Sequence, residues 1–280
     1  MPHFGKKSSL KESKLVGLKQ TIKTRSQQHS GAKMRKFFKH GYFVLLLVSV
    51  LVIKTARADN SIAQLTIACS ANFSATMEQL TALFIATYDQ PIAIKVSTAS
   101  SGTLATQIMH GAPFDLFFSA DKAYPARLNK QGIGIETAQY AAGVLVLYAN
   151  KQDVTLEQLT SSASNLTLTI ANPKYAPYGN AAIQALEQLQ FKPKRLIRGN
   201  SVLHAFQYVD SGHADLGFVA KSVLRPQQQA KAIEIPQSWY EPITQDVLLL
   251  STSSHARAFF EFMQSKPAHT LIQKMGYKLP

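Results

Sequence analysis

The sequence predicts an α/β protein with two lobes, on three observations. Short apolar runs alternate with amphipathic segments after residue 58, which is the pattern of βα units built around a parallel or mixed sheet. Small polar residues separate a strand from a helix at four places. Two apolar segments, 141–150 and 241–250, lie far apart and are each bounded by turn residues. A chain that leaves one lobe, builds a second and returns to the first needs two such crossings.

The amino terminus has the features of an export signal. Residues 42–53 form an apolar run that follows the basic stretch "MRKFFKHG" and precedes "TARA". This order predicts a secretory signal that is cleaved after Ala58 and delivers the protein to the periplasm; an uncleaved membrane anchor is the alternative. An ordinary signal would begin at Met34, so translation starts there or residues 1–33 form an extended basic leader. We therefore set residues 1–58 apart as leader and signal.

The charge of the chain belongs mainly to this leader. The 280 residues carry 30 Lys and Arg against 16 Asp and Glu, a net charge of +14. Residues 1–58 hold 13 of these basic residues and one of the acidic ones, so the remainder is close to neutral at +2. A nucleic acid is consequently not an expected partner. Cys69 is the single cysteine, which excludes an intrachain disulfide and is expected to be a buried thiol.

The elements follow from apolar periodicity. The segment 73–88, for example, places Phe73, Met77, Leu80 and Phe84 at helical spacing. Strands are predicted at 65–69, 92–97, 115–119, 144–148, 166–171, 195–198, 216–219, 232–235 and 246–251. Helices are predicted at 73–88, 103–110, 180–190, 202–211, 255–264 and 267–275, and a polar loop at 225–231. The crossings divide the chain into one lobe of residues 59–140 plus 246–280 and a second of residues 141–245.

The four strand-to-helix corners share one design. They are "ACSANFSATM", "TASSGTL", "APYGNAAI" and "RGNSVLHAF". Each offers free backbone N–H groups, a capping residue and the positive end of a helix dipole. Helix capping alone explains any one of them. Four corners that shared a cleft would present about half a positive charge each and so complement a dianion without Lys or Arg. Hydroxyl and amide groups without an acid or base suit binding an oxyanion rather than converting it.

The chain resembles a known family at "SSGTLATQIMHGAPFDLFFSAD", "ANFSATM", "NPKYAPYGNAAIQAL" and "VDSGHADLGFVAKS". These segments are similar to the periplasmic molybdate-binding proteins of ABC importers, which belong to the two-lobed type II solute-binding class. The resemblance covers essentially all of residues 59–280. It implies that each lobe is a mixed sheet flanked by helices, with the ligand cleft between the lobes. The implied ligand is molybdate or tungstate, bound as an oxyanion with no metal coordinated directly by the protein and no cofactor.

The resemblance also implies which residues bind the anion. The matching positions are the Asn72 side chain, Ser101, and the backbone amides of Tyr178 and Val202. Further candidate contacts are Ala71, Ser100, Gly102 and Ser201. Many family members have a binding tyrosine after the "LGxV" strand, where this chain has Ala220, and Asn72 is the expected compensation for that lost hydroxyl. The implied partners are the small anion and a membrane permease, and we expect a monomer.

Three alternatives stay open at this stage. Sulfate or thiosulfate has the same charge or shape as molybdate, whereas phosphate would favour a carboxylate acceptor that the corners lack. A secreted hydrolase would need a base for a serine such as Ser101, but no G-x-S-x-G motif is present and His204 is the one histidine beside a corner. A transcription regulator with the same lobes would need a DNA-binding segment before residue 59, where the signal stands instead.

Overall fold

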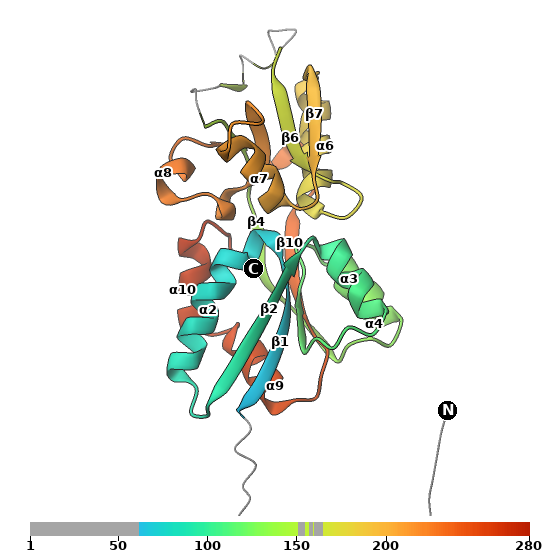
Figure 1. The fold of residues 1–280 in the computed structure, drawn as a ribbon, viewed down its shortest axis with the longest axis vertical. Helices are drawn as coiled ribbons and strands as arrows, with labels where there is room; N and C mark the ends of the chain where they lie inside the picture. Colours follow the sequence, from blue (N-terminus) through green and yellow to red (C-terminus); the bar gives the residue numbers. More distant parts are fainter. Residues whose placement is uncertain (1–61, 151–154, 157–158, 160–164) are drawn as a thin grey trace, which may run out of the picture. The chain divides into compact units, whose positions relative to one another are not determined.

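The computed structural model describes residues 62–150, 155–156, 159 and 165–280. Within these residues the chain forms two five-stranded mixed sheets, each covered by helices (Figure 1). The predicted leader and signal of residues 1–58, with the alternative start at Met34 and cleavage after Ala58, lies outside the described residues. In the described part of the chain, no helix is both long and apolar enough to cross a bilayer.

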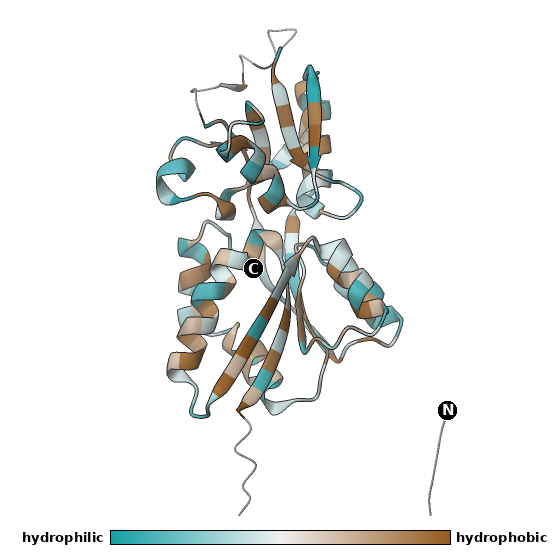
Figure 2. Ribbon diagram, viewed as in Figure 1, coloured by the Kyte–Doolittle hydropathy of each residue, from teal (hydrophilic) through white to brown (hydrophobic). Residues whose placement is uncertain are grey.

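The first sheet has the strand order β2-β1-β3-β10-β4. Its parallel strands are β1 (Ala63–Ser70), β2 (Ile92–Ala99) and β3 (Leu116–Phe118). The strand β10 (Ile243–Leu249) runs antiparallel to β3 and to β4 (Glu136–Gly143). Apolar and polar side chains alternate along β1 in the hydropathy colouring (Figure 2), as expected for a strand in a sheet.

Helices cover both faces of this first sheet (Figure 1). On one face lie α2 (Ser74–Thr87), α9 (Ser254–Phe262) and α10 (Lys266–Lys274), whose buried residues pack with Phe73 and Phe118. On the other face lie α3 (Ser101–Met109) and α4 (Ala123–Lys130), which pack around Phe117. A three-residue 3-10 turn, Ala71–Phe73, joins β1 to α2.

The second sheet has the strand order β7-β6-β8-β5-β9. The parallel strands are β6 (Thr167–Ala171), β7 (Arg195–Gly199) and β8 (Leu216–Ala220). The strand β5 (Leu145–Tyr148) is antiparallel to β8 and to β9 (Ile233–Glu234). The helices are α6 (Pro177–Leu189), α7 (Val202–Asp210) and α8 (Pro226–Gln229), with 3-10 turns at Lys221–Val223 and Gln237–Trp239.

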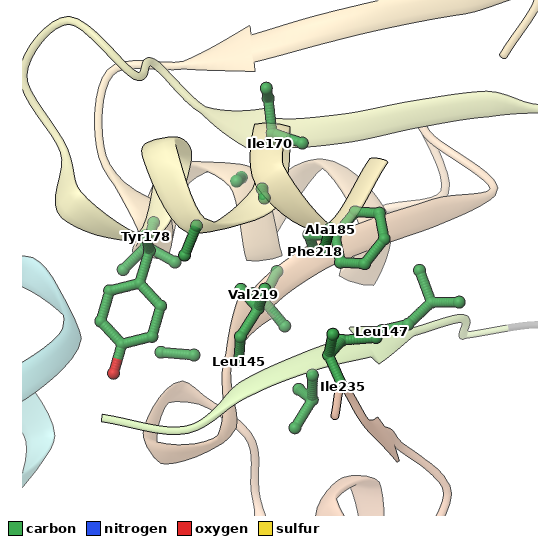
Figure 3. Packing of buried hydrophobic residues seen from close by; sticks show 14 of the residues in the cluster. Leu145, Leu147, Ile170, Tyr178, Ala185, Phe218, Val219 and Ile235 are labelled. Carbon is green, nitrogen blue, oxygen red and sulfur yellow. The ribbon is translucent and has the colours of Figure 1, made fainter. Parts of the chain in front are cut away.

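The core of the second lobe forms between its sheet and α6. Leu145, Ile170 and Phe218 from the strands meet Ala185 from the helix (Figure 3). Tyr178 stands at the edge of this cluster, and Figure 3 shows its hydroxyl pointing away from the labelled apolar side chains. The chain is therefore an α/β protein with two lobes, each built around its own sheet.

The two connections between the lobes lie where β4 passes into β5 and where the chain enters β10. At the first connection Gly143 is tightly enclosed: a Cβ there would lie 2.1 Å from Tyr178 Oη and 2.7 Å from Gln245 Nε2. Residues 141–143 and 243–245, which we expected in the second lobe, pair with each other in the first sheet. The first crossing segment therefore starts within β4, and the second continues into β10. These two strands are antiparallel neighbours in the first sheet.

Three elements differ from the sequence predictions. The helix α4 and the strand β4 were not predicted, and residues 226–229 form the helix α8 where we expected a loop. In α4 only Pro125 and Leu128 are buried, so no apolar stripe marks it as a helix. Cys69 is fully buried as expected, and burial raises the pKa of its thiol far above the usual value.

Candidate functional site

The four polar corners meet at one small pocket between the two sheets. It lies beyond the carboxyl ends of the parallel strands in both lobes, which is where open α/β sheets place their ligands. The lining residues are Ser70, Ala71, Asn72, Ser100, Ser101, Ala120, Ala176, Pro177, Tyr178, Ser201 and Val202. They include the four residues that the resemblance implies as binding residues.

Ser101 is held so that its hydroxyl can donate into the pocket. It is 1% exposed, and its Oγ accepts a hydrogen bond of 2.9 Å from the backbone N–H of Ala120. Because that bond uses a lone pair, the hydroxyl hydrogen is left to donate elsewhere. The neighbouring Ser100 side chain instead caps α3, because its Oγ accepts from Thr103 N at 3.4 Å and is 2.7 Å from Thr103 Oγ1.

The turn after β3 fixes the donor to Ser101. Asp121 Oδ1 accepts hydrogen bonds from Ser119 Oγ at 3.1 Å and from Tyr124 N at 3.0 Å. These bonds hold the turn in which Ala120 points its N–H at Ser101. Burial raises the pKa of the Asp121 carboxyl, while its hydrogen bonds and Arg127 act in the opposite direction. The segment "SAD" thus positions the Ser101 hydroxyl at the pocket.

The second lobe offers backbone amides. Pro177 is the first residue of α6 and has no N–H, so Tyr178 carries the first free amide of that helix. Val202 is the first residue of α7, where the Oγ of Ser201 caps the helix by accepting from His204 N at 3.2 Å. The phenol hydroxyl of Tyr178 accepts from Gln245 Nε2 at 3.3 Å.

Asn72 lines the pocket, and other residues of the protein engage its side-chain amide. The amide nitrogen donates to Gln245 Oε1 at 2.9 Å and to Tyr277 Oη at 3.0 Å, which uses both amide hydrogens. The backbone carbonyl oxygen of Asn72 accepts from Tyr277 Oη at 2.7 Å and from Ser222 Oγ at 3.0 Å.

The other candidate contacts divide between the pocket and its surroundings. Ala71 and Ser201 line the pocket, whereas Gly102 does not; its N–H donates to the Tyr175 carbonyl at 2.9 Å. Ala220 is fully buried at the end of β8 and is not among the lining residues. Sequence reasoning did not select Ser70, although it lines the pocket from the end of β1. A hydroxyl at the carboxyl end of a parallel strand was the available signal.

The pocket is electrically neutral apart from its helix ends. Its lining, all within the described part of the chain, contains no acidic, basic or histidine side chain. Nor do the described residues contain a group of three His, Cys, Asp or Glu that could hold a metal ion. Hydroxyls, amides and four helix starts form a site that donates hydrogen bonds and attracts negative charge.

A two-lobed fold with such a site between its sheets defines a binding protein for a small anion. The family model described as bacterial extracellular solute-binding protein matches residues 65–278, and the chain belongs to this family. It is 34% identical over 220 residues to the molybdate-binding protein ModA of Rhodobacter capsulatus, covering 75% of this chain and 86% of that one.

Solved structures give the same result. The periplasmic molybdate-binding protein of Azotobacter vinelandii superposes with a TM-score of 0.68 at 34% identity, over 77% of this chain and 99% of that one. The sulfate-binding protein SubI of Mycobacterium tuberculosis superposes with a TM-score of 0.63 at 15% identity, over 78% and 87%. At that identity the second match bears on the fold alone.

Proposed function

We propose that this protein captures molybdate, and tungstate with it, outside the cytoplasmic membrane and delivers it to an ABC-type permease. The observation that carries the proposal is the convergence of four helix starts and the Ser101 hydroxyl on one pocket without a charged side chain. The relatives that are 34% identical over most of both chains are molybdate-binding proteins. The anion is the ligand, and no further cofactor is required.

The chemistry of the lining favours an anion without its own proton. Every group placed to contact the ligand is a hydrogen-bond donor, and no carboxylate lines the pocket to accept from an O–H. Phosphate keeps at least one proton near neutral pH and is therefore disfavoured. Sulfate, or thiosulfate, is the alternative ligand because it also presents only acceptors. The match to a sulfate-binding protein shows that the fold itself does not discriminate between these anions.

A secreted hydrolase is the weaker alternative, and the site does not favour it. Ser101 Oγ accepts from a backbone amide instead of donating to a base, and no histidine lines the pocket. His204 packs outside it, with its ring stacked on Tyr208 at 4.7 Å and its Nδ1 accepting from Asn200 N. We therefore infer that the protein binds its ligand without converting it.

The remaining parts of the proposal concern location and partners. We infer a periplasmic monomer, exported by the signal within residues 1–58, which docks on a membrane permease and does not bind nucleic acid. Intact-mass analysis of the exported protein should give an amino terminus within a few residues of Asp59. A mature product that retains residues 1–33 would contradict this processing.

Calorimetric titration of the exported protein with molybdate, tungstate, sulfate and phosphate tests the proposed ligand. We expect molybdate and tungstate to bind more tightly than sulfate, and phosphate to bind weakest. Tighter binding of sulfate than of molybdate would show that sulfate, the alternative ligand, is the one this protein captures. A protein that binds none of the four anions would refute the proposed function.

A further inference from the structure

The pocket contains a buried hydroxyl that the fold leaves without a partner. Ser70 is the last residue of β1 and is 1% exposed, and its Oγ has no hydrogen-bond partner among the described residues. A buried hydroxyl without a partner loses its hydration and gains nothing in exchange, so it lowers the stability of the folded protein. Buried polar groups without a hydrogen bond are uncommon in native proteins, so the presence of this one needs a physical explanation.

The other hydroxyls of the pocket all have partners. Ser100 Oγ is bound to Thr103, Ser101 Oγ accepts from Ala120 N, and Ser201 Oγ accepts from His204 N. Burial raises the pKa of the Tyr140 phenol and the nearby Ser70 hydroxyl acts to lower it, but the geometry between the two side chains does not meet that of a hydrogen bond among the described residues. The Tyr140 hydroxyl donates instead to Gln245 Oε1 at 2.9 Å.

The position of Ser70 in the first sheet places its hydroxyl at the pocket. In the parallel sheet Ser70 lies opposite Ala99, the residue that precedes the Ser100 and Ser101 corner. It therefore stands at the edge where the carboxyl ends of β1 and β2 open into the pocket. Two further hydroxyls, on Thr76 and Thr169, are also buried without a partner, but neither residue lines the pocket.

We propose that Ser70 is a ligand-binding residue whose hydroxyl donates a hydrogen bond to an oxygen of the bound oxyanion. This inference rests on the proposed function and adds a second hydroxyl donor, beside Ser101, on the side of the first lobe. A tetrahedral dianion offers only acceptor oxygens, so it satisfies the Ser70 hydroxyl that the protein alone does not. The hydroxyl slightly destabilises the free protein and stabilises the complex with the anion.

This account predicts opposite effects of Ser70→Ala on binding and on stability. Loss of a hydrogen bond to a charged ligand should weaken molybdate binding about tenfold or more. The free protein should unfold at the same or a higher temperature, because no protein hydrogen bond is lost. A merely structural serine would show the reverse, with lower stability and nearly unchanged affinity.

Thr169→Val is the matched control, because it removes a buried, unpartnered hydroxyl of similar size away from the pocket. The wild type, Ser70→Ala and Thr169→Val are titrated with sodium molybdate by calorimetry and melted without ligand. Weaker binding in Ser70→Ala alone, without loss of stability, supports the assignment. Affinity of Ser70→Ala within twofold of a molybdate-binding wild type overturns it and leaves the proposed function standing. A wild type that does not bind molybdate refutes the proposed function, and the role of Ser70 with it.

Discussion

The backbone N–H of Gly102 donates a 2.9 Å hydrogen bond to the carbonyl oxygen of Tyr175, and this bond joins the two lobes. Gly102 is in the first turn of α3, and Tyr175 is in the loop before α6. A Cβ at residue 102 would lie 2.4 Å from Tyr124 Oη and 3.0 Å from the Tyr175 Cα. The lobes therefore approach closely here, beside a pocket that both of them line, and a side chain at residue 102 would displace Tyr124 and press against the Tyr175 backbone.

Gly102→Ala should weaken ligand binding by opposing this close approach. The added methyl meets backbone on the Tyr175 side, so the lobes must stay slightly apart at the mouth of the pocket. In the free protein the methyl must also displace the Tyr124 hydroxyl, which opposes the preference of a helix for alanine over glycine of up to about 1 kcal/mol, so stability should change little. Molybdate titration and thermal melting measure the two effects. Unchanged affinity would show that the Gly102 to Tyr175 contact is not needed in the liganded state.

The lobes should close around the ligand by bending at the two connections, near residues 141–146 and 241–247. Gly143 and Gln245 lie together in this region, against the Tyr178 hydroxyl, so small backbone rotations there change the separation of the pocket walls. Small-angle scattering of the wild type should give a smaller radius of gyration with saturating molybdate than without it. Equal radii in the two conditions would argue against closure.

Ser101→Ala should reduce molybdate affinity, and it should also lower the stability of the folded protein because the buried N–H of Ala120 loses its acceptor. The variant loses a hydroxyl whose hydrogen is free to donate, and a hydrogen bond to a charged ligand contributes about 1.5–3 kcal/mol, or roughly ten- to a hundredfold in affinity. A structural role alone, as the acceptor for Ala120 N, would lower stability and leave the affinity unchanged. Calorimetry and chemical denaturation of the same variant separate the two cases.

Arg195→Gln and Arg198→Gln are the controls for this measurement. Both arginines are exposed on β7, close in sequence to the corner before α7, and could attract an anion by charge alone. At physiological salt, exposed charges beyond about 8 Å from the anion are largely screened. We expect nearly wild-type affinity in both variants. Loss of binding in the arginine variants and not in Ser101→Ala would mean that charge, not neutral donors, holds the ligand.

The sequence predicts the two-lobed α/β class and the four corners because both depend on local patterns. Capping residues and apolar periodicity identify a strand followed by a helix, as at Ser101 and Val202. The strand β4 escaped prediction because "ETAQYAAG" has neither apolar alternation nor β-branched residues beyond Thr137. The strand is stabilised by pairing with β10, a partner far along the chain.

The hydrogen bonds of the Asn72 side chain are likewise beyond the reach of local pattern. Local sequence shows an amide at a helix start and thus suggests a ligand donor. The acceptors that engage this amide are Gln245 and Tyr277, which are 173 and 205 residues away. Only the folded chain brings them together, so the local pattern could not reveal that the amide hydrogens are already used. Ser70 shows the converse, because its lack of a partner is visible only in the fold.

Asn72→Ala should therefore destabilise the protein more than it changes the chemistry of the pocket. Removal of the amide takes one buried donor from Tyr277 Oη and one from Gln245 Oε1, which still accepts from Tyr140 Oη, at a cost of about 1–3 kcal/mol in the free energy of unfolding. Tyr277→Phe is the partner variant, and the effects of the two substitutions should be less than additive because they share one network. Denaturant unfolding of both single variants and the double variant gives the coupling. A stable Asn72→Ala protein that has lost molybdate binding would restore the side chain as a ligand donor.

The pH dependence of stability should carry the signature of buried carboxyls beside the pocket. Burial raises the pKa of Asp121, and of Asp246 in the neighbouring strand, where Lys122 acts to lower it. A carboxyl with a raised pKa binds more protons when folded than when unfolded, in the range between the two pKa values. Its contribution to stability is thus fully present below the unfolded pKa and falls as the pH rises through the folded pKa.

Asp121→Asn should flatten this decline. The asparagine oxygen can still accept from Tyr124 N, so the turn that presents Ala120 to Ser101 is kept, while the cost of a buried negative charge is removed. Urea unfolding between about pH 4 and pH 7 should show a smaller loss of stability with rising pH than in the wild type. The slope should not vanish, because Asp246 still titrates in the same direction. An equal or steeper decline in Asp121→Asn would show that the carboxylate stabilises the turn by more than its burial costs.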